Sequence, residues 1–149
     1  MKYLIRPMRK EDISDVISGE KKVFEDSLGE DFLIHDFELN PFSYYLVLEI
    51  NGKIKGYMGT WIHDNLEILN FYVDKRYQGM GFGSMMLEFI IEVSKKSNVK
   101  SITLEVRKNN IIAISLYRKY GFKEVGIRNR YYNNGDDAIL MEKKLVELW

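Results

Sequence analysis

The chain has 149 residues, and 22 Lys plus Arg balance 22 Asp plus Glu, so its formal net charge at pH 7 is zero. It has no cysteine and only two histidines, which excludes disulfides, thiolate metal sites, a cysteine nucleophile and a three-histidine zinc site. The length predicts one domain, residues 1–149, and we expect no metal. The balanced charge gives no reason to expect direct binding to nucleic acid.

The first residues, MKYLIRPMRKEDI, become polar after two or three apolar positions, unlike a secretory signal. No apolar run approaches the roughly 18 residues of a membrane span. Together with the absence of cysteine, this leads us to expect a cytoplasmic protein without a membrane partner.

Three elements are predicted before Pro41. Tyr3 to Arg6 is typical of a short strand that the next residue, a proline, halts. Apolar residues recur at helical spacing from Glu11 to about Phe24 and predict a helix. The mixed stretch Glu25 to Asn40 predicts a short helix within loops.

An antiparallel meander follows. Ser43 to Ile50 and Lys53 to Ile62 are predicted strands, and the Asn51-Gly52 pair between them is a strong hairpin signal. Leu66 to Val73 is predicted to be the third strand.

The second half alternates helices and strands. Ser84 to Lys96 is apolar over a wide arc, which predicts a largely buried helix lying across a sheet. The remaining predicted elements are a strand at Ser101–Arg107, a helix at Asn110–Tyr120 ended by Gly121, and strands at Lys123–Arg130 and Ala138–Leu145. The element order predicts an α+β (α/β) fold, a mixed, mostly antiparallel sheet flanked by helices.

A glycine-rich segment, Gln78-Gly79-Met80-Gly81-Phe82-Gly83, lies between a predicted strand and the buried helix. Glycines allow backbone N–H groups to approach an anion, and a helix N-terminus adds partial positive charge, so a pyrophosphate is the expected ligand. A Walker-type loop is disfavoured because no Gly-Lys-Ser/Thr follows, and a dinucleotide fingerprint because the loop follows a meander. A tight turn without any ligand stays open on the loop alone.

Several motifs in order resemble the GCN5-related N-acetyltransferase (GNAT) superfamily. Its cofactor loop, Gln/Arg-x-x-Gly-x-Gly/Ala, is met by Gln78, Gly81 and Gly83. The likeness extends from about Asn70 to Met141, roughly half the chain, through Leu104-Glu105-Val106-Arg107, Asn110, Tyr117 and Gly121-Phe122. It implies the GNAT fold, with a splayed strand pair at the cofactor site, and acetyl-CoA as cosubstrate.

The last third resembles the RimI branch of that superfamily, protein N-terminal alanine acetyltransferases. The pieces that carry this likeness are Arg128-Asn129-Arg130-Tyr131-Tyr132 and Asp137-Ala138-Ile139-Leu140-Met141. Tyr131 and Tyr132 could line a peptide groove or serve packing, and both alternatives stay open.

The resemblance implies two groups of cofactor-binding residues. Backbone groups of the strand before the loop would bind the pantetheine arm and polarise the thioester carbonyl, and the loop would cradle the pyrophosphate. The positions are Phe71, Tyr72 and Val73 on the strand, and Gln78, Gly79, Met80, Gly81, Phe82, Gly83 and Ser84 in the loop. The strand residues also suit a plain buried strand. Tyr72 departs from the small residue of many relatives, and could narrow the amine pocket or pack outside it.

Acetyl transfer needs a neutral amine, and an α-amino group with a pKa of roughly 8 costs about 1.4 kcal/mol to deprotonate at pH 7, against about 4.6 kcal/mol for lysine. Glu105 is the candidate base, acting directly or through water, and the resemblance also places a catalytic glutamate there. The alternative is a solvated carboxylate that pairs with Arg107 or Lys108.

Tyr117 is the candidate acid for the departing thiolate, with a core aromatic as its alternative. Asn110 lies two helical turns earlier, so both residues project from one face, and Asn110 is expected to bind the pantetheine arm, to cap the helix, or both.

These expectations define an acetyl-CoA-dependent transferase that acts on a protein N-terminus, the N-terminal alanine of a ribosomal protein first of all. The partners would be acetyl-CoA and that peptide. A small-amine acetyltransferase, a non-catalytic acyl-CoA-binding module and a nucleotide-binding regulatory domain are the alternatives.

Overall fold

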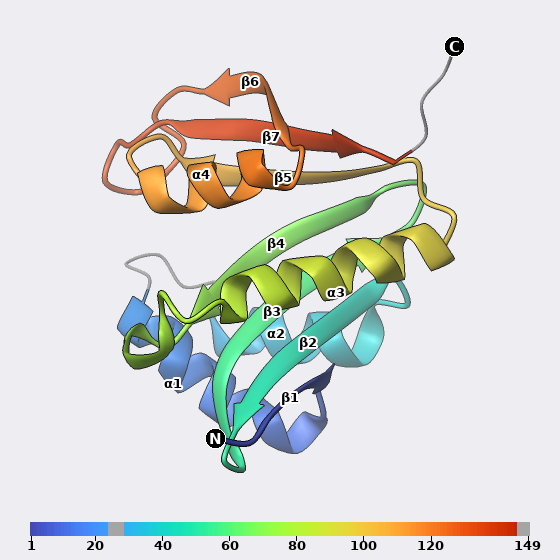
Figure 1. The fold of residues 1–149 in the computed structure, drawn as a ribbon, viewed down its shortest axis with the longest axis vertical. Coiled ribbons are helices and arrows are strands. Elements are labelled where there is room, and N and C mark those ends of the chain that lie inside the picture. The colour runs from blue at the N-terminus through green and yellow to red at the C-terminus, as the bar shows by residue number, and fades with distance from the viewer. Residues whose placement is uncertain (24–28, 146–149) are drawn as a thin grey trace.

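The computed structural model describes residues 1–23 and 29–145. Seven strands form one mixed sheet in the order β1-β2-β3-β4-β5-β7-β6, with helices on both faces (Figure 1). Neighbouring strands are antiparallel except β4 and β5, which run parallel. In chain order the elements are β1 (Tyr3–Pro7), a 3-10 turn (Lys10–Asp12), α1 (Ile13–Val23), α2 (Glu30–Leu39), β2 (Ser43–Ile50), β3 (Lys53–Ile62), β4 (Leu66–Val73), a second 3-10 turn (Lys75–Tyr77), α3 (Phe82–Lys96), β5 (Ser101–Arg107), α4 (Ile111–Lys119), β6 (Lys123–Arg128) and β7 (Ala138–Lys144). The predicted fold class is confirmed.

The β2–β3 hairpin forms where the sequence predicted it. Asn51 and Gly52 have φ values of 51° and 79°, and two consecutive positive φ angles are typical of the tight turn that suits the twist of two antiparallel strands. The bounds of the two flanking strands and of β4 are also those predicted.

Each face of the sheet has its own apolar core. On the face turned to the viewer in Figure 1, α3 and α4 pack on the strands, and Leu87, Ile114 and Leu104 belong to this cluster. On the opposite face α1 and α2 cover β2–β4, and Val16 and Leu33 belong to that second cluster. The sheet therefore separates two helical layers, and a residue's position in the strand alternation decides which layer it faces.

Several predicted boundaries need correction. Strand β1 includes Pro7, the proline expected to halt it, and α4 and β7 end one residue earlier than predicted, α4 also starting one residue later. The helix predicted from Glu11 begins as a 3-10 turn and becomes α-helical at Ile13, and its predicted last residue, Phe24, lies outside the described residues. Helix α3 starts at Phe82, earlier than predicted. Strand β6 stops at Arg128, because Arg130 has a φ of 51° and donates its N–H to Asp137 Oδ1 at 2.9 Å, which turns the chain.

The junction of β1 with α1 is held by a buried ion pair. Arg6 Nη1 lies 2.7 Å from Asp12 Oδ2, and both side chains are only 10% exposed. Asp12 also accepts the N–H of Arg9 at 2.8 Å, and Arg6 Nη2 reaches Glu49 Oε1 at 3.2 Å. The hydrogen bond from Arg6 holds the pKa of Asp12 below its ordinary value.

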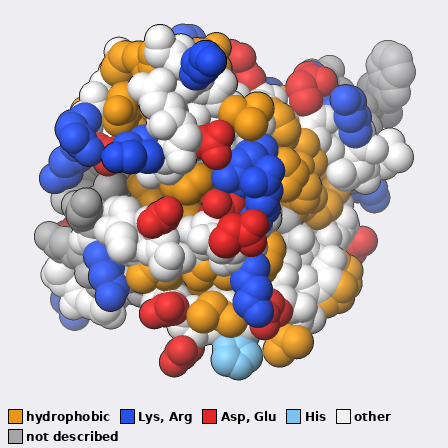
Figure 2. Space-filling model, turned by 90° about the horizontal axis from the view of Figure 1, so that it is seen from below, with side chains coloured by type: hydrophobic (Ala, Val, Ile, Leu, Met, Phe, Trp, Pro, Cys, Tyr) orange, Lys and Arg blue, Asp and Glu red, His pale blue; other side chains and the backbone are white. Residues whose placement is uncertain are grey.

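Charge is not segregated on the face seen in Figure 2, where acidic and basic side chains are interspersed. Among the described helices, none combines the length and the apolar character that crossing a bilayer requires.

Candidate active site

The site begins where β4 and β5 part. The two strands pair only over their first residues, Leu66–Ile68 against Ile102–Leu104. Beyond that point β4 stays paired with β3 as far as Val73, while β5 stays paired with β7 as far as Arg107. Figure 1 shows the two strands diverging, and a bulge in the β3–β4 ladder lies beside the point of divergence. The predicted splayed pair is confirmed.

Two main-chain positions of β4 face the split between the strands. The N–H of Asp74 donates to Lys55 O on β3 at 2.8 Å. Because hydrogen-bonding groups alternate sides along an antiparallel strand, the main chain of Tyr72 also faces β3. The main-chain groups of Phe71 and Val73 point the other way, into the split, where a carbonyl or an amide of a ligand can pair with them.

Polar side chains already cover two of those groups. Asn70 Oδ1 accepts the N–H of Phe71 at 3.1 Å, and Gln78 Nε2 donates to Val73 O at 2.8 Å. The second contact ties the glycine loop to the end of β4. It gives Gln78 a positioning role for the loop in addition to the predicted one.

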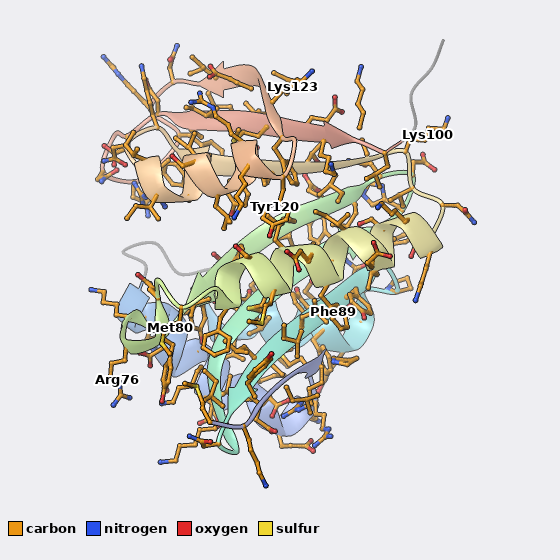
Figure 3. The ribbon with its side chains drawn as sticks, in the orientation of Figure 1. Arg76, Met80, Phe89, Lys100, Tyr120 and Lys123 are labelled. Atoms are coloured by element: carbon orange, nitrogen blue, oxygen red, sulfur yellow. The ribbon has the colours of Figure 1, made fainter. Side chains whose placement is uncertain are left out.

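The loop makes a left-handed entry into α3. Gly79 and Gly81 have φ values of 76° and 89°, a region that side chains other than glycine rarely adopt. The first bond of the helix runs from Met85 N–H to Gly81 O at 3.0 Å, so the N–H groups of the preceding positions, Phe82–Ser84, have no helical acceptor. These N–H groups and the helix dipole form a site suited to a pyrophosphate, and the exposed Met80 marks the loop in Figure 3.

Gly83 leaves space between the two helices of this layer. A Cβ built on it would lie 3.7 Å from Leu116 Cδ2 of α4 and 3.8 Å from Phe71 Cζ of β4, which are ordinary contacts. The protein's own packing therefore does not require glycine here. A ligand that runs from the loop toward Phe71 would pass this position, so the residues present fit acetyl-CoA.

Helix α4 forms the other wall of this space. Asn110 caps it, since its Oδ1 accepts the N–H of Ala113 at 3.2 Å, which is one of its two expected roles. Near the other end, Tyr120 lies between α4 and α3 (Figure 3) and donates its hydroxyl to Glu88 Oε1 at 2.5 Å. This contact joins the two helices across the layer.

Tyr117 is buried in the α4 layer. It is 7% exposed, and its ring packs on Phe122 with centroids 5.6 Å apart. Within the described ranges no residue hydrogen-bonds to its hydroxyl. Burial raises its pKa well above the ordinary value, with a smaller contribution from nearby Tyr132. The phenol is thus fully protonated at neutral pH and has its donor available.

Glu105 faces the opposite layer. Its neighbours Leu104 and Val106 point into the α3–α4 core, so strand alternation directs Glu105 to the face covered by α1 and α2. Its Oε1 lies 3.1 Å from Arg128 Nε, and its carboxylate raises the pKa of nearby Tyr131. The partners are therefore neither of the two neighbours considered from the sequence.

The β6–β7 loop is anchored by Arg107 at the end of β5. Arg107 Nη1 contacts Asp136 Oδ2 at 3.0 Å and Asn134 Oδ1 at 2.9 Å. Its guanidinium also lies 3.9 Å from the centroid of the Tyr132 ring. These contacts fix the loop that carries Tyr131 against the end of β5.

The Tyr72 side chain packs in the layer of α1. Its ring lies 5.5 Å from that of Tyr57, and its hydroxyl donates to Val16 O at 3.1 Å. Gly19 is required there, because a Cβ would come within 2.1 Å of the Tyr72 hydroxyl oxygen. The ring also borders a cavity of about 410 Å³, whose other lining residues are Asp15, Ser18, Gly19, Lys53, Ile54, Lys55, Asp74 and Lys75.

Sequence reasoning missed three partners of the site. Arg128 and Tyr131 were quoted for the resemblance but were not connected to Glu105, and Glu67 of β4 was not singled out. Glu67 pairs in register with Thr103 and is close enough to Tyr131 to raise its pKa. A signal existed for Glu67, because strand alternation puts it on the same face as Glu105.

Comparison with known proteins identifies the class that this fold and site define. The family model described as the acetyltransferase (GNAT) family matches residues 10–122. The chain belongs to this family and is an acetyltransferase, as the resemblance implied.

Two relatives and one solved structure refine that identification. The chain is 37% identical over 142 residues to a putative ribosomal protein bS18-alanine N-acetyltransferase of Bacillus subtilis, with 94% of each chain covered. It is 30% identical over 157 residues to an N-alpha-acetyltransferase of Sulfurisphaera tokodaii, covering 96% of this chain and 93% of the relative. The crystal structure of the ribosomal-protein-S18-alanine N-acetyltransferase from Escherichia coli matches with a TM-score of 0.90 and 28% identity, over 99% of this chain and 97% of that one. The resemblance to the RimI branch is confirmed.

Proposed function

We propose that the protein transfers the acetyl group of acetyl-CoA to the α-amino group of a protein N-terminus, and that the natural acceptor is the N-terminal alanine of a ribosomal protein. One observation carries the proposal. The split between β4 and β5 joins a cofactor layer, formed by the glycine loop, α3 and α4, to an acceptor layer that contains Glu105. The named relatives support the acceptor class.

The two substrates would meet from opposite faces of the sheet. Acetyl-CoA would lie between α3 and α4 with its pyrophosphate on the N–H groups of Phe82–Ser84 and its pantetheine along β4, near Asn110. The N–H groups of Phe71 and Val73 face the split, where they can stabilise the charge that develops on the thioester oxygen; that of Phe71 must first leave Asn70 Oδ1. Tyr72 contributes its side chain to the acceptor layer.

Glu105 would receive the proton of the attacking amine, directly or through one water. Tyr117 would serve the leaving thiolate from the cofactor layer. Its raised pKa makes complete proton transfer to a thiolate of pKa about 8.5 unfavourable at the start, so we assign it a hydrogen bond that strengthens as the carbon–sulfur bond breaks. The cytoplasm, where ribosomal proteins are made, is the proposed location.

The test incubates the protein with acetyl-CoA and peptides that differ in their first residue, next to N-terminally blocked peptides and a panel of free amines, with mass shifts as the readout. We expect acetylation of peptides with a free N-terminus, alanine first. Acetylation of a polyamine, antibiotic or amino acid with no peptide modified would select the small-amine alternative. Calorimetric CoA binding without any turnover would select the binding module, and ATP binding the nucleotide-binding domain.

A matched pair of variants tests the role of Glu105. Glu105→Gln should reduce kcat/KM most at low pH, where the neutral amine is scarcest and a base is needed most. Glu124→Gln removes another carboxylate on this sheet that lies near an arginine, Arg118 at 4.0 Å, and should leave the rate unchanged. Equal activity of both variants across the pH range would remove Glu105 as the base.

A further inference from the structure

The proposed base is already paired with a cation. Glu105 Oε1 lies 3.1 Å from Arg128 Nε, and the side chains are 26% and 54% exposed respectively. The Arg128 guanidinium carbon lies 5.4 Å from the centroid of the Tyr131 ring, and the same carboxylate raises the pKa of Tyr131. Glu105 therefore already holds a cation in the free protein, with the Tyr131 phenol nearby.

An acceptor N-terminus brings a second cation to this point. With a pKa of roughly 8, an α-amine is mostly protonated near pH 7. A carboxylate that takes a proton from it must first be reached by the ammonium, and a guanidinium on the same oxygen repels that ammonium. The two cations must exchange places or share the site.

A second carboxylate enlarges the capacity of this site for positive charge. Glu67 of β4 is opposite Thr103 of β5, and Glu105 is the next residue of β5 on that face. Glu67 and Glu105 both raise the pKa of Tyr131, which places both negative charges near one hydroxyl. Two carboxylates and one guanidinium leave a net charge of minus one beside the split.

We propose that Arg128 occupies the binding position of the acceptor's ammonium group and is displaced by it, with Glu67 as the second carboxylate of that position. This inference rests on the proposed function and concerns how the same site admits its acceptor. Arg128 is the last residue of edge strand β6, and its half-exposed side chain can turn to solvent without disturbing the core. Arg128 is a positioning and specificity residue that acts through Glu105. Only a cationic acceptor can replace the positive charge that Arg128 places beside Glu105.

The charged and titratable groups near Glu105 define the variants. On its face of the sheet they are Arg128 from β6, Tyr131 from the β6–β7 loop, Glu67 from β4, Arg107 from β5 itself and Glu142 from β7. Removal of Arg128 takes away a competing cation and also the charge that favours ionised Glu105. The two effects act on different kinetic parameters.

The test compares Arg128→Gln, Arg128→Lys and Glu67→Gln by steady-state kinetics with an N-terminal peptide at several pH values. Arg128→Gln should lower KM for the peptide by roughly threefold to fivefold, the range of a partly exposed ion pair, and move the acid limb of kcat/KM to higher pH. Arg128→Lys should restore both values toward those of the natural protein, and Glu67→Gln should raise KM. Arg118→Gln, which disrupts the contact of Arg118 with Glu124, is the control and should change neither.

An uncharged inhibitor separates exchange from a structural role. A peptide whose α-amino group is replaced by hydroxyl should inhibit the natural protein and Arg128→Gln equally, because it brings no cation. A higher peptide KM in Arg128→Gln, or an equal change for the hydroxyl peptide, would overturn the proposal. Failure of the natural protein to acetylate any peptide would instead overturn the proposed function.

Discussion

Gly83 offers a substitution in which stability and cofactor binding should change in opposite directions. It occupies the first turn of α3, and a Cβ there would make only ordinary contacts, 3.7 Å to Leu116 and 3.8 Å to Phe71. Gly83→Ala should therefore fit the free protein without displacing a neighbour. The methyl group would, however, occupy part of the path that acetyl-CoA takes from the loop to β4.

The magnitude follows from helix propensity. Alanine is more favourable than glycine in a helix by about 0.5–1 kcal/mol, so Gly83→Ala should raise the free energy of unfolding by up to that amount. At about 2–4 °C per kcal/mol for a chain of this size, the midpoint of thermal unfolding should rise by roughly 1–4 °C. The KM for acetyl-CoA should rise about tenfold. The added methyl group would push a closely packed ligand away from the helix and weaken its binding by an amount on the order of 1.4 kcal/mol.

Gly81→Ala is the matched control. Its Cβ would have no heavy atom within 4 Å, but its φ of 89° penalises a side chain by roughly 1–2 kcal/mol. Gly81→Ala should therefore lower the unfolding midpoint. Thermal unfolding and acetyl-CoA titration of both variants check the expectation. An unchanged acetyl-CoA KM in Gly83→Ala would refute the path that we assign to the cofactor.

Three further expectations follow from single groups. Tyr117→Phe should lower kcat by about tenfold or more while CoA still binds by calorimetry, because the buried hydroxyl is the proposed donor to the leaving sulfur; unchanged turnover would discard that role. Tyr57→Phe should raise the free energy of unfolding by about 1 kcal/mol in denaturant titration, because its buried hydroxyl has no hydrogen-bond partner among the described residues, whereas Tyr45→Phe removes a hydroxyl that donates to a buried carboxylate and should lower it. Asp12→Asn should cost about 3 kcal/mol at pH 7 by leaving Arg6 poorly paired. Because the pKa of Asp12 is depressed in the folded state, its stabilisation is present above the unfolded pKa of about 3.9 and is lost as pH falls through the lower folded value. The difference between the two proteins should therefore shrink in acid, and a constant difference would contradict the assignment.

Elements that a few adjacent residues determine could be predicted in detail from the sequence. The turn at Asn51-Gly52 and the alternation of Ser101–Arg107 depend on a few adjacent side chains, and the structure has both. The glycine loop was predictable for the same reason, since Gly79 and Gly81 adopt the positive φ angles that only glycine tolerates easily. The end of β6 was not, because the turn at Arg130 depends on a bond to Asp137 across the loop.

The partner of Glu105 depends on contacts between segments that are distant in the sequence. Strand β7 inserts between β5 and β6, which brings Arg128 to Glu105 although 23 positions separate them. From the sequence, Arg107 was the nearer cation, but it is turned to the β6–β7 loop, where Asp136 binds it. Neither Arg107 nor Lys108, the partners considered from the sequence, pairs with Glu105, because the register of the strand ladder sets which side chains meet across a sheet.

The candidate site lies on two faces of one sheet, and this arrangement suits direct acetyl transfer in a chain that has no cysteine. The chain has no cysteine, so it cannot hold the acetyl group as a thioester, and we expect the acetyl group to pass directly between substrates bound at the same time. A split in the sheet is the place where substrates from opposite faces can come into contact, because elsewhere a paired strand separates them. The same split leaves the main-chain amides of Phe71 and Val73 without a strand partner, and in the proposed mechanism they donate to the developing negative charge, that of Phe71 after leaving Asn70 Oδ1. In the proposed mechanism the parting of β4 from β5 thus supplies both the passage and the oxyanion donors. We therefore expect steady-state kinetics to show a ternary complex rather than a ping-pong pattern.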